Sequence, residues 1–358
     1  MIRINWKHVA VTLAVLPLAA VLFAWIGFFN VGASTGHWKI TDWFLHFAMR
    51  SAVRTYALAV DEPERLPVEA IKPAAGHFAR GCAICHGAPG EPRSPATLKM
   101  LPLPPDLASV AGEWEDAELF RIVKHGVRFT GMPAWPTQNR DDEVWAMVAF
   151  LRALPEMDAA TYRELAYGPA GTAVLHASTF DNALAECSRC HGADAKGGGP
   201  TTPVLAGQSA AYLEASLEAF AKGHRSSGIM GIPSRAVDPS LIGPLAAHFS
   251  GKPWSRPEEQ DPSPDSLQRG EAIARDGIRT KGVPACLGCH GGETHNPSYP
   301  RIAGQKRRYL AGQLNLFRAG MRGGGPFSHL MTNAARGLSD ADIDDLAAFF
   351  AAQDSLPR

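Results

Sequence analysis

The chain has 358 residues, of which 46% are apolar and 20% charged, an ordinary composition for globular domains. At about 100 to 200 residues per domain, this length accommodates two or three units. Lys plus Arg equals Asp plus Glu, at 35 each, so the chain has no basic field and we do not expect it to bind nucleic acid.

The N-terminus is predicted to form a transmembrane signal-anchor over residues 1–30. Val9 to Phe29 is an almost uninterrupted apolar run of 21 residues, and a helix of about 20 residues crosses a bilayer. Arg3 and Lys7 precede the run, which places the N-terminus in the cytoplasm and the rest of the chain outside. A signal peptide cleaved at Val31-Gly32-Ala33 is the alternative, although its apolar core is typically only about 7 to 15 residues.

Residues 31–66 are predicted to form a juxtamembrane amphipathic segment and hinge. Aromatic and basic side chains occur together here, and Thr41 or Asp42 is suited to cap a helix. We expect this helix to lie at the membrane surface, or to be a docking face for an integral membrane partner. His37 and His46 have no paired ligands nearby, so we interpret them as interfacial residues rather than metal ligands.

Three copies of Cys-x-x-Cys-His, the attachment signature of c-type haem, use all six cysteines of the chain. Two thiols at this spacing reach the two vinyl-derived carbons on one porphyrin edge, and the next histidine lies under the iron. Zinc would require a second ligand pair within about 12 to 20 residues, and a thioredoxin-like site would require a βαβ pattern; neither is present. We predict three covalently bound haem c groups. The attaching cysteines are Cys82, Cys85, Cys187, Cys190, Cys286 and Cys289, and the axial histidines are His86, His191 and His290.

In the first haem unit, one helix is predicted to run into Gly81 and the last to cover Asp141 to Leu154, where apolar residues recur at helical spacing. A methionine is expected as the sixth iron ligand, because a thioether favours ferrous iron and raises the potential. We choose Met132. Met100 is the competitor, but it lies only fourteen residues beyond His86 in a proline-rich loop.

The second and third units form an internal repeat. Leu205-Ala-Gly-Gln208 matches Ile302-Ala-Gly-Gln305 at an offset of 97 residues, and the following helices match as well. Beyond them the offset grows to 101, and Met230 then aligns with Met331. Met321 does not align with a methionine. We therefore predict Met230 and Met331 as the axial sulfur ligands of these two units.

Each unit also has a proline between its histidine and its methionine, at Pro105, Pro203 and Pro300. The proline carbonyl is a suitable acceptor for the free ring N–H of an iron-bound histidine. In the second unit Leu213, Leu217 and Phe220 share one helical face, which we expect to pack over the haem edge.

From roughly residue 165 to 358 the chain resembles a dihaem cytochrome c4. The shared motifs are Cys-x-x-Cys-His-Gly, Pro-x-[LI]-Ala-Gly-Gln, Tyr-Leu, Phe-x-x-Gly-x-Arg, a ligand methionine and a terminal Leu-Ala-Ala-x-Phe helix. The first haem unit is similar to a single-domain class I cytochrome c, and the whole chain resembles a membrane-anchored trihaem respiratory cytochrome. Gly243-Pro244 departs from the pattern and is expected to interrupt the last helix of the second unit.

The resemblance implies an all-α fold in which a transmembrane helix precedes three cytochrome c-like domains, with haem added outside a bacterial cytoplasmic membrane and the domains in the periplasm. The predicted domains are unit one (67–157), unit two (158–255, c4-like) and unit three (256–358, c4-like).

The expected function is the transfer of single electrons in a respiratory chain, without catalysis by the chain itself. His/Met ligation leaves no open iron position, and no residues are arranged for acid, base or nucleophilic catalysis. The expected partners are the lipid bilayer, an integral membrane respiratory complex, chiefly a haem-copper oxidase fed from the quinol-oxidising side, and a soluble cytochrome c. The alternative is a cytochrome subunit of a membrane-bound alcohol, aldehyde or sugar-acid dehydrogenase. A peroxidase-like enzyme would need one open haem.

Overall fold

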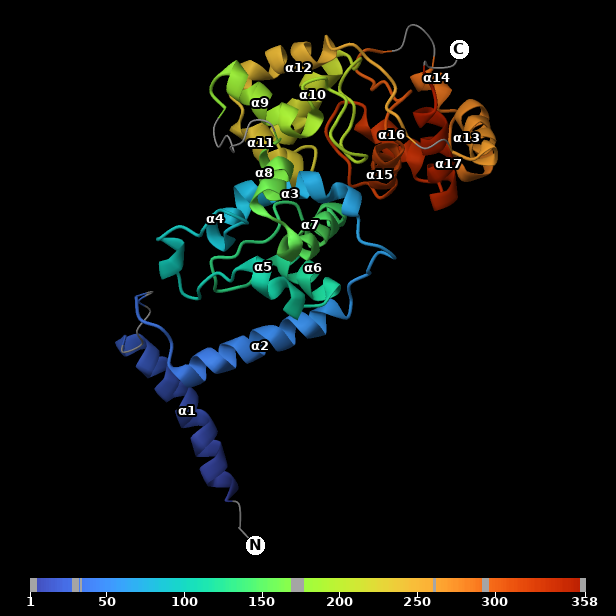
Figure 1. Ribbon diagram of the computed structural model, residues 1–358. Coiled ribbons are helices and arrows are strands. Elements are labelled where there is room, and N and C mark those ends of the chain that lie inside the picture. Colours follow the sequence, from blue (N-terminus) through green and yellow to red (C-terminus); the bar gives the residue numbers. More distant parts are fainter. Residues whose placement is uncertain are drawn as a thin grey trace.

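The structure is a computed structural model that describes residues 5–27, 32, 34–168, 177–259, 262–291 and 296–354. These residues form helices joined by loops, and in these ranges the only β structure is three isolated bridges (Figure 1). The predicted all-α fold is confirmed. Arg3, the end of the predicted span beyond Gly27, and Val31 and Ala33 of the alternative cleavage site lie outside the described residues.

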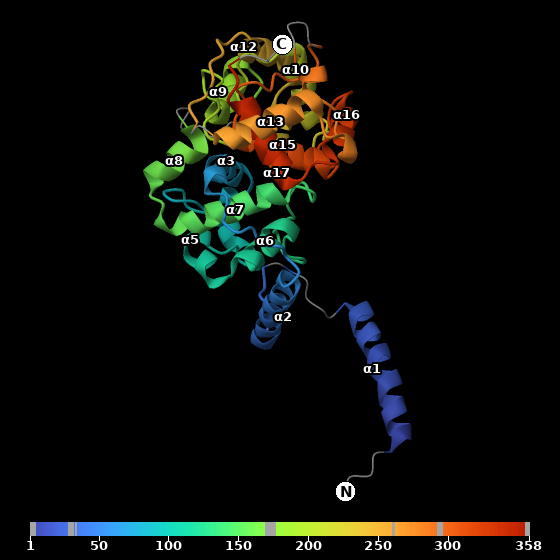
Figure 2. The same cartoon turned by 90° about the vertical axis from the view of Figure 1, so that its right-hand side faces the viewer.

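Helix α1 (Trp6–Ile26) projects away from the rest of the molecule (Figures 1 and 2). Its 21 residues have a mean hydropathy of 2.5, and none of them is buried. The helix begins three residues before the predicted Val9, because the Asn5 side chain accepts a hydrogen bond from the Lys7 N–H and caps it. This helix is long and apolar enough to cross a membrane, a property that a signal sequence shares.

The juxtamembrane helix α2 covers Lys39–Ala57. It begins with Trp38 at the N-cap position, so the prediction that Thr41 or Asp42 caps it was wrong. Asp42 lies instead in the first turn, where its carboxylate faces the positive end of the helix dipole.

Helix α2 packs against α6 (Asp116–His125) of unit one. Arg50 pairs with Glu113 at 2.7 Å, and Arg54 lies 3.4 Å from the carboxylate of Glu118. The remaining faces of α2 carry exposed apolar side chains: Ile40, Trp43, Phe44, Leu45, Phe47 and Tyr56. Arg50 and Arg54 are thus turned toward unit one, and Trp43, Phe44 and Phe47 are left at the surface.

Unit one has a core of buried aromatic and aliphatic side chains in which Phe78 packs against Phe150 and Tyr162. The predicted helix into Gly81 is confirmed, and the helix predicted as the last one ends one residue before Leu154. It is not the last of the unit, because a further helix, Ala159–Tyr167, packs into the same core beyond the predicted boundary at residue 157. The helices are α3 (Ile71–Gly81), α4 (Ala83–His86), α5 (Leu107–Val110), α6, α7 (Asp141–Ala153) and α8 (Ala159–Tyr167).

Units two and three each have a separate core, and the three helices that follow the Cys-x-x-Cys-His segment come in the same order in both. In sequence, α10, α11 and α12 of unit two correspond to α15, α16 and α17 of unit three. The helices are α9 (Phe180–His191), α10 (Ala210–Ala221), α11 (Gly228–Ala236) and α12 (Ile242–Ser250), followed by α13 (Pro264–Asp276), α14 (Leu287–His290), α15 (Arg307–Arg318), α16 (Ser328–Ala335) and α17 (Asp340–Ala351).

The expected interruption at Gly243-Pro244 was wrong. Helix α12 runs unbroken from Ile242 to Ser250, and Pro244 is its third residue. The first four N–H groups of a helix have no partner within it, so a proline there removes no hydrogen bond.

Units two and three are joined by two glutamines of the repeated Ala-Gly-Gln motif. Gln208 donates to the Arg301 carbonyl (2.7 Å) and accepts from the Arg301 N–H (2.9 Å). Gln305 makes the same pair of bonds with Val204, both at 2.9 Å. The repeated motif thus becomes a reciprocal contact, and the two units lie side by side above unit one (Figures 1 and 2).

Unit one is joined to unit two by a buried ion pair between Arg80 and Glu186, whose side chains are 3% and 4% exposed. Arg189 also donates to Glu186 at 2.7 Å. Since Arg80 comes two residues before Cys82 and Glu186 directly precedes Cys187, this cluster brings two Cys-x-x-Cys-His segments close together.

Candidate haem-binding sites

Each Cys-x-x-Cys-His segment forms a helical turn, in α4, at the end of α9 and in α14. Residues three and four positions apart lie on the same face of a helix, so the two cysteines and the histidine of each copy point to one side. None of the six cysteines forms a disulfide. The local geometry is therefore the one that attachment to one porphyrin edge requires.

The first thiol of each segment lies in apolar surroundings. Burial raises the pKa of Cys82 and Cys187 to about 12 and that of Cys286 to about 11. Among the described residues, no group of three or more His, Cys, Asp or Glu side chains is arranged to hold a metal ion.

The three histidines of the motifs are buried, with 7 to 9% of each exposed. His86 Nδ1 lies 2.8 Å from the Pro105 carbonyl, and His191 Nδ1 lies 3.4 Å from that of Pro203. A carbonyl only accepts, so Nδ1 carries the hydrogen and the lone pair is on Nε2. Burial lowers the pKa of His86, and it lowers that of His191 to about 4, so both rings are neutral. The corresponding contact of His290 with Pro300 stays a prediction.

A cavity of about 910 Å³ extends through units two and three. Leu213, Leu217 and Phe220 line it, so the face predicted to cover the haem edge does border this space. The structure brings together in its lining all the predicted attachment and axial residues of both units: Cys187, Cys190, His191 and Met230, with Cys286, Cys289, His290 and Met331.

Two arginines in the lining test whether haem fits this cavity. Arg225 and Arg322 are enclosed between units two and three and donate to the hydroxyls of Tyr309 and Tyr212. Within the described part of the chain, neither guanidinium has a carboxylate partner. Buried cations without counter-ions are unfavourable. The propionate groups of haem are anions suited to this position, so the residues present fit the cofactor.

In unit one, Met132 lies in the loop between α6 and α7, and Met100, from the loop between α4 and α5, lies next to it. Met132 is half-buried, and its N–H donates to Thr130 Oγ1 at 3.1 Å. Met100 contacts Gly131, the residue before Met132: a Cβ added at Gly131 would lie 2.5 Å from the Met100 methyl carbon. The choice of Met132 over Met100 therefore stays a prediction.

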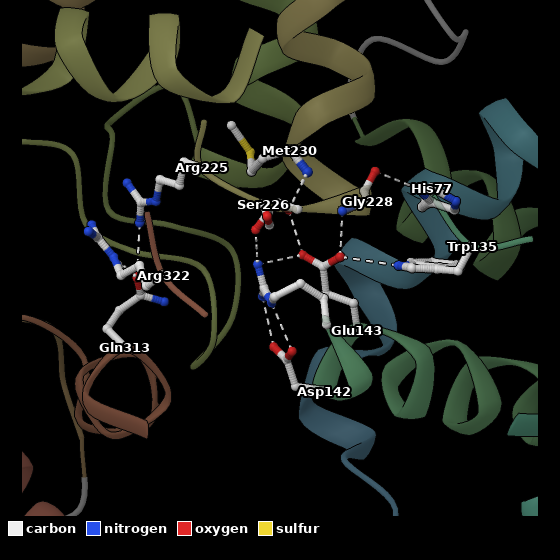
Figure 3. A network of polar contacts seen from close by, with 12 residues as sticks. His77, Trp135, Asp142, Glu143, Arg225, Ser226, Gly228, Met230, Gln313 and Arg322 are labelled. Atoms are coloured by element: carbon white, nitrogen blue, oxygen red, sulfur yellow. Dashed lines mark hydrogen bonds and ion pairs between the residues drawn. The ribbon is translucent and has the colours of Figure 1, made fainter. Parts of the chain in front are cut away.

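Sequence reasoning missed a group of residues where unit one meets unit two (Figure 3). Glu143 is 4% exposed although it follows two other acidic residues at the start of α7, a pattern typical of a solvated helix N-terminus. Trp135 and His77 are also buried there. In the sequence only the Trp135 position, three residues after Met132, pointed to this region.

Comparison with protein families and curated proteins gives two family matches. Residues 69–151 match the family described as cytochrome c oxidase, cbb3-type, subunit III, and residues 179–241 match the cytochrome c family. A thiosulfate dehydrogenase electron acceptor from Stutzerimonas stutzeri (strain A1501) is 34% identical over 177 residues, which cover 46% of this chain and 77% of that protein. Cytochrome c4 from Azotobacter vinelandii is 31% identical over 177 residues, covering 46% and 83%.

Among solved structures, Acidithiobacillus ferrooxidans cytochrome c4 is similar with a TM-score of 0.42 and 30% identity, covering 46% of this chain and 97% of that one. Reduced recombinant cytochrome c4 from Pseudomonas stutzeri has a TM-score of 0.42 and 27% identity, covering 49% and 100%.

Proposed function

Since this chain belongs to the c-type cytochromes and is related to cytochrome c4, we propose that it is a membrane-anchored trihaem cytochrome that passes single electrons to a terminal haem-copper oxidase. Its relatives are electron-transfer proteins, and that part of the function is established by the similarity. The observation that carries the proposal is the meeting of two Cys-x-x-Cys-His motifs and two methionines in one cavity.

The proposed haem sites follow the three units. Each predicted unit, 67–157, 158–255 and 256–358, has its own core, although Tyr162, Ala166 and Tyr167 of α8 belong to the core of unit one; three cores support one haem per unit. The proposed axial pairs are His86 with Met132, His191 with Met230, and His290 with Met331.

Haem supplies one-electron chemistry when it is bound, and the chain supplies its setting. The Pro105 and Pro203 carbonyls orient the imidazoles and leave the Nε2 lone pairs free, so these histidines would hold the haem iron through Nε2. Apolar side chains form most of the cavity lining, and Arg225 and Arg322 add positive charge to it. Such charge stabilises a reduced, more negative haem and raises its potential.

The proposed location is the outer face of the bacterial cytoplasmic membrane, with α1 as a single-pass anchor and the haem units in the periplasm. The length and apolarity of α1 support the anchor, and the exposed aromatic side chains of α2 suit the membrane surface. An anchored carrier searches for its partner in two dimensions, which raises the effective concentration of that partner.

The oxidase as acceptor is supported by the match of unit one to a family described as subunit III of a cbb3-type oxidase. The test is purification of the full chain from native membranes in mild detergent. Recovery with a haem-copper oxidase, and oxygen consumption when the trihaem protein is reduced, are expected. Recovery without an oxidase, and no oxidation of the reduced haems by oxygenated membranes, would contradict the proposal.

A second candidate is a cytochrome partner of a dehydrogenase. Two relatives are named thiosulfate dehydrogenase electron acceptors, which supports a donor of this type alongside the alcohol, aldehyde and sugar-acid dehydrogenases. The same purification distinguishes the two functions. Co-purification with a dehydrogenase, together with haem reduction when thiosulfate or an alcohol is added, would favour the second.

A further inference from the structure

The segment before Met230 is held by residues of unit one (Figure 3). Ser226, Ser227 and Gly228 all make hydrogen bonds to unit-one side chains, and Ile229 packs against the unit-one core. Met230 follows at once, in the first turn of α11. The proposed iron ligand of unit two thus extends from a loop that is enclosed by another unit.

Glu143 makes the central contacts of this junction. Its carboxylate accepts from the Ser227 hydroxyl at 2.5 Å and from the Gly228 N–H at 2.6 Å. Ser227 Oγ in turn accepts from the Met230 N–H at 2.9 Å and so caps α11. Two hydrogen bonds therefore link the Glu143 carboxylate to the backbone of Met230.

Arg140 stabilises the charged form of this carboxylate. Its guanidinium lies 3.0 Å from Glu143 and donates to the Ser226 carbonyl at 2.8 Å. Burial raises the pKa of Glu143, and the nearby Arg140 opposes this shift. Asp142 also pairs with Arg140 at 2.8 Å, but it is 55% exposed and makes no hydrogen bond to the Met230 segment in the described structure.

The other side of the segment is closed by two rings of unit one. His77 Nδ1 lies 3.1 Å from the Gly228 carbonyl, and the centroids of the His77 and Trp135 rings lie 4.2 Å apart with the rings tilted by 33°. A Cβ added at Gly228 would lie 2.5 Å from Trp135 Nε1, so only glycine fits here. Trp135 comes three residues after Met132, so the methionine segments of units one and two meet at this point.

We propose that Glu143 of unit one is a positioning residue for Met230, so that the sulfur ligand of haem two is set by the docking of unit one. This rests on the proposed role of Met230 as a ligand. Removing the carboxylate leaves the Ser227 hydroxyl, the Gly228 N–H and Arg140 without their shared buried partner. Such groups are costly to leave unpaired, and the segment relieves this by moving toward water and carrying Met230 with it.

The test compares Glu143→Gln and Glu143→Ala with the matched control Asp142→Asn in the full, haem-loaded chain. Asp142→Asn alters the same arginine without touching the Met230 segment. The sulfur-to-iron charge-transfer absorption of the oxidised protein and the binding of added imidazole are measured. In the Glu143 variants we expect the share of one haem, about one third of the absorption, to weaken. We also expect one of the three haems to bind imidazole about tenfold more tightly, or more. The control is expected to match the unchanged protein.

Unchanged absorption and imidazole affinity in both Glu143 variants would overturn the proposal. If these variants do not fold, Ser227→Ala removes only the linking hydroxyl and is expected to shift both readouts in the same direction; no shift there also overturns it. Met230→Ala separates the two claims. Loss of one third of the absorption in Met230→Ala, without any effect in the Glu143 variants, rejects the positioning role alone, whereas no loss in Met230→Ala rejects the ligand itself.

Discussion

The guanidinium of Arg225 in unit two donates to the hydroxyl of Tyr309 in unit three over 3.1 Å. The equivalent pair runs the other way, from Arg322 in unit three to Tyr212 in unit two, over 3.3 Å. Both arginines also donate to Gln313. Each unit therefore completes the cationic site of the other, and the two proposed haem positions share one electrostatic environment.

The first prediction concerns this charge. Arg225→Gln removes a buried cation beside the proposed propionates, so the potential of at least one haem is expected to fall by about 60 mV, a tenfold change for one electron. A spectroscopic redox titration measures it. Arg235→Gln is the control, because Arg235 is exposed and, among the described residues, its one hydrogen bond is to the Ala221 carbonyl. Equal potentials in the two variants would contradict the assignment.

The second prediction concerns the contact between units two and three. Gln305→Ala leaves the N–H and the carbonyl of buried Val204 without their partner, and we expect a loss of about 1 to 3 kcal/mol in unfolding free energy. The control Gln353→Ala removes one hydrogen bond to the Phe349 carbonyl at the end of α17. A loss of about 0.5 kcal/mol or less in unfolding free energy is expected. Urea unfolding monitored by circular dichroism compares them. A loss for Gln305→Ala no greater than for the control would show that the reciprocal contact does not hold the units together.

The third prediction concerns the junction between Arg80 and Glu186. Glu186→Ala leaves the buried guanidinium groups of Arg80 and Arg189 without their shared carboxylate, and the expected cost is about 3 to 5 kcal/mol. The control Glu218→Ala breaks the exposed pair with Lys222, for which about 0 to 1 kcal/mol is expected. Thermal unfolding of both variants is compared. Similar melting temperatures would mean that the buried cluster stabilises the protein no more than the exposed pair does.

The fourth prediction concerns pH. Burial lowers the pKa of His77 from about 6.5 to about 4, so the folded protein favours the neutral ring. Its contribution to stability is complete above pH 6.5 and is lost as the pH falls toward 4, by up to about 3 kcal/mol. The stability of His77→Gln should fall less than that of the unchanged chain over this range. His224→Gln, at an exposed position, should follow the unchanged chain. Parallel curves of stability against pH for the unchanged chain and both variants would contradict the prediction.

The sequence predicted the parts of the molecule that depend on local pattern. The helices ending at Gly81 and near Leu154 follow from apolar spacing, and the motifs of units two and three follow from their repeat. Since each Cys-x-x-Cys-His copy is five residues long, its geometry is fixed by one helical turn. The convergence of Met230 and Met331 on the cavity is likewise consistent with the alignment of the repeat.

Contacts between units could not be predicted, because they depend on which surfaces meet. Glu143 stands in an acidic run, Asp141 to Glu143, yet it is buried where it contacts Gly228 of unit two. The interruption expected at Pro244 was wrong for a different reason. The helix begins two residues earlier, so the proline falls in the turn that needs no N–H.

The central claim is that three haem groups are bound covalently to one polypeptide. The most direct measurement is the alkaline pyridine spectrum of the purified full-length protein, set against its protein concentration. We predict three haem c groups per chain, and two when Cys286 and Cys289 are both replaced by alanine. Fewer than three in the unchanged chain would contradict the account.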